Sequence, residues 1–462
     1  MYAIAFASLG VQVDGLVGEA GILPAGEFLR RVADRLGPDA YARLPTICWL
    51  VGADARTLQL LCAAGVACGL ALLAGVLPGP AALAAWALYL SLVGVGQVFL
   101  AFQWDALLLE SGLLALLIAP WRLRPPAWNP SAVGLLPLWC LVAKLHLLSG
   151  WVKLASGDPT WWNLTALHYH YWTTCLPVWV GWYAAKLPDL VQRASVLVMF
   201  AIELGAPFAI LGPRRLRHAA AAAMIALQLA IAVTGNYGFF NLLTIALCAT
   251  LFDDAALARV LPFVRAPVAR RPSAPRRLLA AAAAAAACGL VLLPLAARVV
   301  LPEALARPAL HALEALAPLH SVNAYGLFAN MTTVRPEIVV EGSDDGVHWR
   351  PYEFRWKPGD PHRRPGFVQP HMPRLDWQMW FAALQGYQRT YWFGPFLDRL
   401  LDGSPAVTRL LGEQPFPGSR PRYVRAVLYR YEFASPAERR AGLWWRREPI
   451  GMYTPVRRRA DP

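Results

Sequence analysis

The chain has 462 residues, of which 57% are hydrophobic and 16% are charged, and its mean hydropathy is positive. This composition lies outside the range of soluble globular domains and excludes a soluble enzyme. The net charge of +14 comes almost entirely from arginines, which lie in short segments between apolar stretches and in the last third of the chain. That distribution favours membrane topology over nucleic-acid binding.

Long apolar stretches follow one another through the first 300 residues. A membrane helix needs about 20 mostly apolar residues. On this criterion the sequence predicts spans at 57–77, 81–102, 106–119, 133–153, 189–212, 217–234, 236–252 and 278–300. Residues 1–13 are apolar but too short to cross alone, and we interpret them as the end of a first helix. The predicted fold class is an α-helical polytopic membrane bundle of about 8–9 spans.

Arginines gather in alternate loops of this arrangement. They are Arg122, Arg124, Arg214, Arg215, Arg217, Arg259, Arg265, Arg270, Arg271, Arg276 and Arg277. The positive-inside rule makes this side cytoplasmic. The opposite, extracytoplasmic side receives the C-terminal region and the N-glycosylation sequons at Asn163 and Asn330.

The composition changes after residue 300 to arginine, proline and aromatic residues. Residues 338–349 are typical of two strands around an Asp-Gly turn. Residues 352–356 and 423–433 alternate apolar and polar side chains, as half-buried strands do. We therefore expect a multi-span transmembrane domain at 1–300 and a soluble, β-rich domain at 301–462 on the lumenal or periplasmic side.

Charged side chains inside apolar spans are the first candidates for chemistry, because they are costly in hydrocarbon unless paired or facing a cavity. Asp105 stands at the start of a predicted helix and is most simply an N-cap. Glu110 lies more than one turn inside. The span at 133–153 contains His146 and Lys153, seven residues apart on one helix face, with Lys144 opposite Lys153.

Glu110 and Lys153 fall in the same half of the membrane if their helices are antiparallel neighbours. We therefore predict that they belong to one polar network, which His146 could extend. A lysine in low dielectric can act as a base. The alternative is structural: Lys153 reaches the interface and His146 makes a core hydrogen bond.

Residues 157–183 are dense in Trp and Tyr, which is typical of a membrane interface. His168 and His170 lie within this segment, but two positions apart on a helix they diverge. The seven cysteines have no metal-binding spacing. No metal site is predicted.

Ten ordered stretches resemble the lipase maturation factor family. They are GILP at 21–24, FQWD at 102–105, LLESG at 108–112, SGWVKL at 149–154, SGDPTWW at 156–162, TGNYGFFN at 234–241, NAYGLF at 323–328, MTTVRPE at 331–337, EGS at 341–343 and DWQMWFAAL at 376–384. The motif and network residues singled out are Gln103, Trp104, Asp105, Glu110, Lys153, Asn236 and Tyr237.

This resemblance implies an endoplasmic-reticulum membrane protein that helps secreted lipases reach their folded, active dimeric form. In a bacterium the corresponding place is the inner membrane, with the C-terminal domain in the periplasm. The implied partners are membrane lipids and secreted client proteins. The implied function is not enzymatic, and neither catalytic residues nor a cofactor follow from it.

A second, partial resemblance is to the transmembrane region of vitamin-K-dependent γ-carboxylases, around residues 151–154 and 161–167. It implies that Lys153 acts as a base on a quinol. The alternative function is therefore a membrane enzyme that uses Lys153, His146 and Glu110 on a quinone-like cofactor. A quinone-sized, lysine-lined cavity among the spans would favour the enzyme, and a solid polar network would favour the maturation factor.

Overall fold

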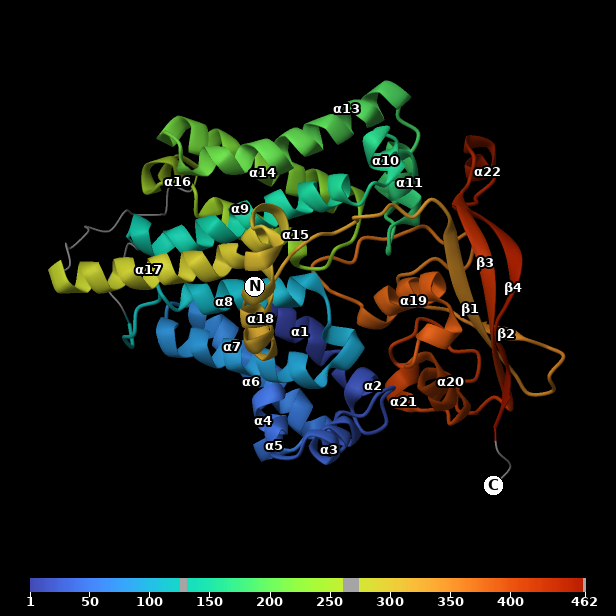
Figure 1. The fold of residues 1–462 in the computed structure, drawn as a ribbon. Helices are drawn as coiled ribbons and strands as arrows, with labels where there is room; N and C mark the ends of the chain where they lie inside the picture. The colour runs from blue at the N-terminus through green and yellow to red at the C-terminus, as the bar shows by residue number, and fades with distance from the viewer. Residues whose placement is uncertain (125–130, 261–273, 460–462) are drawn as a thin grey trace.

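The structure is a computed structural model that describes residues 1–124, 131–260 and 274–459. A bundle of helices is followed by a sheet that stands across one end of the bundle (Figure 1). The arginines predicted at 265, 270 and 271 lie outside the described residues.

Six helices among the described residues are long and apolar enough to cross a membrane. They are Ala55–Leu73 (α6), Pro78–Val95 (α7), Ala132–Ala155 (α9), Asp189–Leu211 (α13 and the two turns after it), Arg214–Thr234 (α14) and Arg277–Val300 (most of α17, Ala274–Leu295, and the turn after it). Each corresponds to a predicted span. The other predicted spans form shorter helices, namely α1 (Tyr2–Gly10), α8 (Gln103–Ala115) and α15 (Phe240–Ala249).

Many apolar side chains of the long helices point outward. Leu70 on α6, Leu197 on α13, Leu229 on α14 and Leu279 on α17 are all exposed. Patches of this kind are rare on soluble monomers and are normal on helices that face lipid. The outer helices are therefore suited to a hydrocarbon environment.

The helix that begins with α13 (Asp189–Phe200) changes its winding before it ends. It continues through a π-helical turn, η3 (Ala201–Gly205), into a 3₁₀ segment, η4 (Ala206–Leu211). Pro207 accounts for the change, because its ring lacks an N–H and clashes with the carbonyl four residues earlier. That earlier residue is Glu203, which the wider turn places at the inner side of the helix, where it is buried.

Within the described ranges the strands form one four-stranded antiparallel sheet in the order β2-β1-β3-β4. The strands are β1 (Arg335–Ser343), β2 (Arg350–Tyr352), β3 (Tyr423–Phe433) and β4 (Trp445–Arg458). Register is fixed by pairs such as Val339 opposite Val427. Of the two strands predicted within 338–349, the first is present in β1, whereas its partner begins only at Arg350. The strand predicted at 423–433 is β3, but the one predicted at 352–356 is wrong, because β2 ends at Tyr352.

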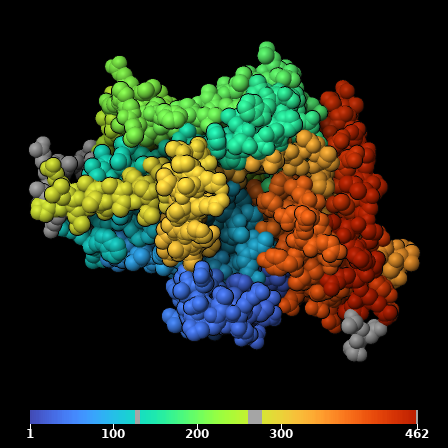
Figure 2. Space-filling model, in the orientation of Figure 1, coloured from blue at the N-terminus to red at the C-terminus, as the bar shows by residue number. Residues whose placement is uncertain are grey.

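The C-terminal region is less purely β than predicted, because helices accompany the sheet. The main ones are α18 (Glu303–Leu316), α19 (Arg374–Gln385) and α20 (Phe393–Leu401). A continuous core of buried side chains joins this region to the helices, from Phe6 of α1 to Val424 of β3. Figure 2 shows the orange and red C-terminal residues packed along one end of the bundle, with the yellow α18 across its front.

Candidate functional site

Two buried polar groups account for most of the residues that the sequence singles out. The first runs along α8, where the helices meet the C-terminal region. The second lies in a cavity bounded by α9, α13 and α14.

Asp105 forms a buried ion pair with Arg374 at the start of α19. Both Asp105 oxygens lie 2.8 Å from a guanidinium nitrogen of Arg374, and both side chains are 1% exposed. Tyr89 of α7 donates to the same carboxylate at 2.5 Å. The N-cap interpretation of Asp105 is wrong, because the N-cap position of α8 is Phe102 and Asp105 lies within the first turn. Its carboxylate joins two distant parts of the chain instead.

Glu110 is paired with Lys144 of α9. Glu110 Oε1 lies 2.5 Å from Lys144 Nζ, and both side chains are completely buried. Tyr325 donates its hydroxyl to Glu110 Oε2 at 2.6 Å, and Lys144 donates to the carbonyl oxygen of Asn323 at 2.9 Å. The NAYGLF stretch is therefore held on the helices by a satisfied ionic network, the arrangement that makes a buried charge tolerable.

The remaining α8 and loop residues make contacts of the same kind. Gln103 exchanges two hydrogen bonds with the backbone of Gly326. Trp104 packs edge-on against Trp377 of α19, with ring centroids 4.7 Å apart. Asn236 donates to the carbonyl of Gly366 and accepts from the backbone N–H of Val368, at 2.9 Å each. These residues fix the C-terminal region in position on the helices.

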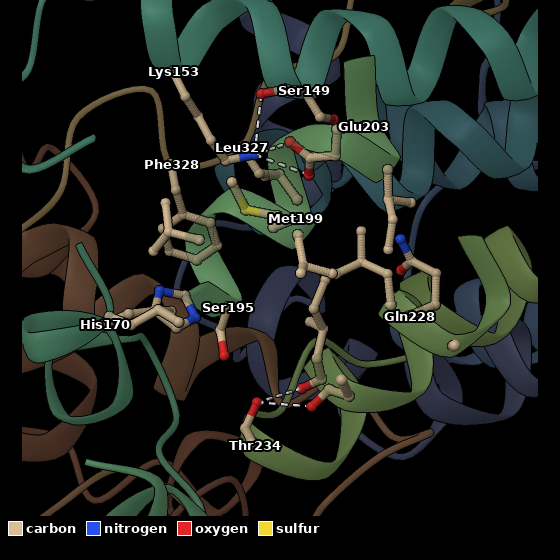
Figure 3. A pocket seen from close by; sticks show the side chains of 18 of the residues that line it. Ser149, Lys153, His170, Ser195, Met199, Glu203, Gln228, Thr234, Leu327 and Phe328 are labelled. Atoms are coloured by element: carbon tan, nitrogen blue, oxygen red, sulfur yellow. Dashed lines mark hydrogen bonds and ion pairs between the residues drawn. The ribbon is translucent and has the colours of Figure 1, made fainter. Parts of the chain in front are cut away.

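Lys153 pairs with Glu203, so the prediction that it shares a network with Glu110 is wrong. Lys153 Nζ lies 2.7 Å from Glu203 Oε2 and 3.0 Å from Oε1, and it also donates to the carbonyl of Ser149. The two side chains are 6% and 8% exposed. Figure 3 shows Lys153 paired with Glu203. Lys144 pairs with Glu110 instead, so the two lysines, which the helical period puts on opposite sides of α9, meet different helices.

The Lys153–Glu203 pair lies in the wall of a cavity of about 760 Å³. This volume is in the range of ligand sites, about 300–1,000 Å³. Most lining side chains are apolar and come from α9, α13, α14 and the segment around Phe328. His146 lines the cavity together with Lys153, so the predicted common face of these two residues is confirmed.

Tyr237 and His170 form a second polar corner of the cavity. The Tyr237 hydroxyl lies 3.0 Å from His170 Nε2 and 3.0 Å from the hydroxyl of Thr174. Burial, assisted by the charge of Lys153, lowers the pKa of His170 to about 4. The imidazole is therefore neutral at physiological pH, and Lys153 contributes the positive charge at this end of the cavity.

His168, Asn163 and Asn330 were also singled out from the sequence, but they do not line the cavity. His168 contacts Asp189 at 2.9 Å and is separated from the His170 interaction. Asn163 and Asn330 are both exposed. They lie on neighbouring segments, because Trp161 donates to the carbonyl of Phe328.

Sequence reasoning missed Glu203, Arg374 and a buried pair at the start of β1. Arg335 contacts Glu337 at 2.5 Å and donates to the carbonyls of Trp172 and Cys175. A signal for Glu203 was present, since it is a carboxylate within an apolar span. Arg374 had no comparable local signal, because its partner is 269 residues away.

The cavity combines an ammonium–carboxylate pair, a neutral imidazole and a phenol with apolar walls. An ammonium held by a carboxylate is a hydrogen-bond donor rather than a free base. Among the described residues, no three His, Cys, Asp or Glu side chains gather to hold a metal. The mostly apolar walls suit the cavity to binding an organic molecule of low polarity.

Comparisons with known proteins cover nearly the whole chain. Residues 1–259 match the family model described as lipase maturation factor transmembrane domain, and residues 321–455 match that of the lipase maturation factor C-terminal domain. The chain is 36% identical to Lipase maturation factor 2 of Homo sapiens, over 100% of this chain and 82% of that protein. It is 33% identical to Lipase maturation factor 1 of Mus musculus, over 100% of this chain and 86% of that protein. No solved structure matches the chain.

Proposed function

The chain belongs to the lipase maturation factor family, and we propose that it is a membrane protein that assists the folding and maturation of secreted proteins such as lipases. The observation that supports this most is that similarity to the family extends over both the helices and the C-terminal region. We place the protein in the endoplasmic-reticulum membrane of a eukaryote, or in the inner membrane of a bacterium.

We also propose nine membrane-crossing segments with the C-terminal region on the lumenal or periplasmic side. The contacts of α1, α8 and α15 support this count, because each of these short helices packs against longer ones: α1 against α6, α8 against α7 and α9, and α15 against α14 and α9. For example, Arg217 at the start of α14 donates to the carbonyl of Leu251 just after α15. The arginine-rich starts of α14 and α17 lie at the end of the bundle away from the sheet (Figure 1). This separation agrees with a cytoplasmic arginine side. Asn163 and Asn330 would then be glycosylation acceptors on the lumenal side.

The buried contacts suggest how such a factor would act on a client. The ion pair between Asp105 and Arg374 and the hydrogen bond from Tyr325 to Glu110 attach the C-terminal region to the helices. Its outermost strand, β4, exposes both apolar and cationic side chains, including Ile450, Met452 and Arg458. A mixed surface of this kind suits transient contact with incompletely folded chains.

A refolding experiment tests the proposal. The chain in lipid nanodiscs should increase the yield of active lipase when a denatured secreted lipase is diluted into native buffer. Empty nanodiscs are the control for lipid alone. An equal yield of active lipase with and without the chain would contradict the proposal.

One observation favours a second function, a carboxylase-like membrane enzyme acting on a quinone-like cofactor. The cavity is of suitable size and contains Lys153 in its wall. Lys153 would act as a base only after Glu203 releases the ammonium. Lys153→Met separates the two functions, since an enzyme would lose turnover while a maturation factor that still folds would keep its effect on lipase.

A further inference from the structure

The cavity opens sideways between α13 and α14. Leu190 and Val198 of α13 line the cavity and are 78% and 57% exposed. Ala226 and Ala230 of α14 also line it and are exposed. Both helices are candidate membrane spans, so the opening faces the hydrocarbon of the bilayer rather than water.

The charges inside the cavity are already compensated. Lys153 has its hydrogen bonds filled by both oxygens of Glu203 and by the carbonyl of Ser149. These two are the charged members of the described lining, and His170 is neutral at physiological pH. A phosphate or ammonium headgroup would have to break the pair in order to be stabilised. The cavity therefore selects an uncharged ligand.

Two buried polar atoms of the lining side chains have no hydrogen-bond partner among the described residues. They are His146 Nε2 and Asn241 Oδ1. His146 Nδ1 lies 2.9 Å from the carbonyl oxygen of Val142, which can only accept, so Nδ1 carries the proton and Nε2 is an acceptor. Asn241 uses its amide nitrogen to donate to Gln228, which leaves Oδ1 as an acceptor as well.

Each of these acceptors can be paired by a ligand that donates a hydrogen bond. An ester or quinone carbonyl cannot do so, whereas a hydroxyl can. We propose that this cavity binds an uncharged, hydroxyl-bearing membrane lipid, which enters laterally between α13 and α14 and donates its one hydroxyl hydrogen to His146 Nε2 or to Asn241 Oδ1. Diacylglycerols and sterols share this chemistry. The proposal is independent of the maturation function.

Photolabelling of the full chain in phosphatidylcholine nanodiscs tests the site. The probe is a diacylglycerol with a photoreactive group in one acyl chain, and the control is phosphatidylcholine with the same photoreactive chain. The diacylglycerol probe should label peptides covering 190–203 and 226–241. Labelling of the same peptides to the same extent by the phosphatidylcholine probe would overturn the proposal.

Competition identifies the ligand more closely. Unlabelled diacylglycerol should displace the probe, and the same lipid with its hydroxyl acetylated should compete about five- to tenfold less well, because it loses a donated hydrogen bond. Stronger competition by cholesterol would support the proposal and identify the source of the hydroxyl. Equal competition by the acetylated lipid, or stronger competition by a quinone, would refute it.

Variants at the opening test the route. Ala194→Trp and Ala230→Trp fill the gap from either side and should reduce labelling about tenfold. Ala222→Trp, also at an exposed position of α14 but outside the cavity lining, is the matched control and should leave labelling unchanged. Unchanged labelling in both opening variants would contradict lateral entry.

Discussion

The Lys153–Glu203 pair should show strong energetic coupling in a double-mutant cycle. Lys153→Met leaves the Glu203 carboxylate buried without a counter-charge, and Glu203→Gln leaves the ammonium in the same state. Because both side chains are less than one-tenth exposed, each single change should cost about 3–5 kcal/mol of unfolding free energy. The double variant has no uncompensated charge and should recover about 2–3 kcal/mol of the sum.

A parallel cycle between Lys153→Met and Glu110→Gln is the control. Glu110 is held by Lys144, which lies nine residues before Lys153 and on the opposite face of α9. Nine residues correspond to roughly 13–14 Å along a helix, and the two pairs share no hydrogen-bond partner among the described residues. Their effects should add to within about 0.5 kcal/mol.

Equilibrium unfolding in mixed detergent micelles measures both cycles. Additivity in the Lys153 and Glu203 cycle would refute the pairing. Coupling of similar size in the Lys153 and Glu110 cycle would show that the two polar groups are one network.

Further predictions concern the joint between the two regions, acid stability and topology. Arg374→Met should destabilise the chain by about 3–5 kcal/mol, because Asp105 is left buried and charged. Thermal unfolding measures this, and the double variant Arg374→Met, Asp105→Asn should recover part of the lost stability. The low pKa of His170 means that the unfolded chain binds a proton from about pH 6.5 downward while the folded chain resists it to about pH 4. The contribution of His170 to the free energy of unfolding should therefore be fully present above about pH 6.5 and should fall toward pH 4 by at most about 1.4 kcal/mol per pH unit. In the variant His170→Asn, the free energy of unfolding should depend less on pH over this range. The topology is tested in a variant that lacks the native cysteines. A cysteine introduced at the exposed Val347 should react with a membrane-impermeant thiol reagent added on the lumenal or periplasmic side, and one at Arg215 should not. The reverse pattern would contradict the proposed orientation.

The long apolar helices were predictable because their signal is local. A run of about 20 apolar residues is visible in any window, and the ends of α9 and α14 agree with the predicted spans to within three residues. The short helices were harder to place. α8 and α15 owe their position to burial against neighbours, for example through Leu107 and Leu243, rather than to length.

The partners of the buried charges could not be read in the same way. The helical period correctly separates Lys144 from Lys153, but it does not say which neighbouring helix each one faces. Glu203 meets the same criterion as Glu110, because it too is a carboxylate within an apolar span. With both carboxylates considered, Lys153 could pair with either Glu110 or Glu203. The choice between them depends on the packing of α13 and its π-helical turn on α9.

In the C-terminal region, too, local patterns in the sequence predict some elements but not the contacts between distant residues. The alternation that predicts β3 is a local pattern, whereas β4 exposes most of its residues on both faces and lacks such alternation. The N-cap interpretation of Asp105 failed because the carboxylate is satisfied by Arg374 of α19. Such contacts arise only from tertiary structure.

The specific activity of a secreted lipase tests the maturation function most directly. Cells that lack their own maturation factor would express the lipase with the chain, and enzyme activity per amount of secreted lipase protein would be measured. We expect a higher specific activity with the wild-type chain and with the Lys153→Met, Glu203→Gln double variant, in which the buried charges are removed together. A specific activity no higher with the wild-type chain than without it, although the chain is present in the membrane, would contradict the proposed function.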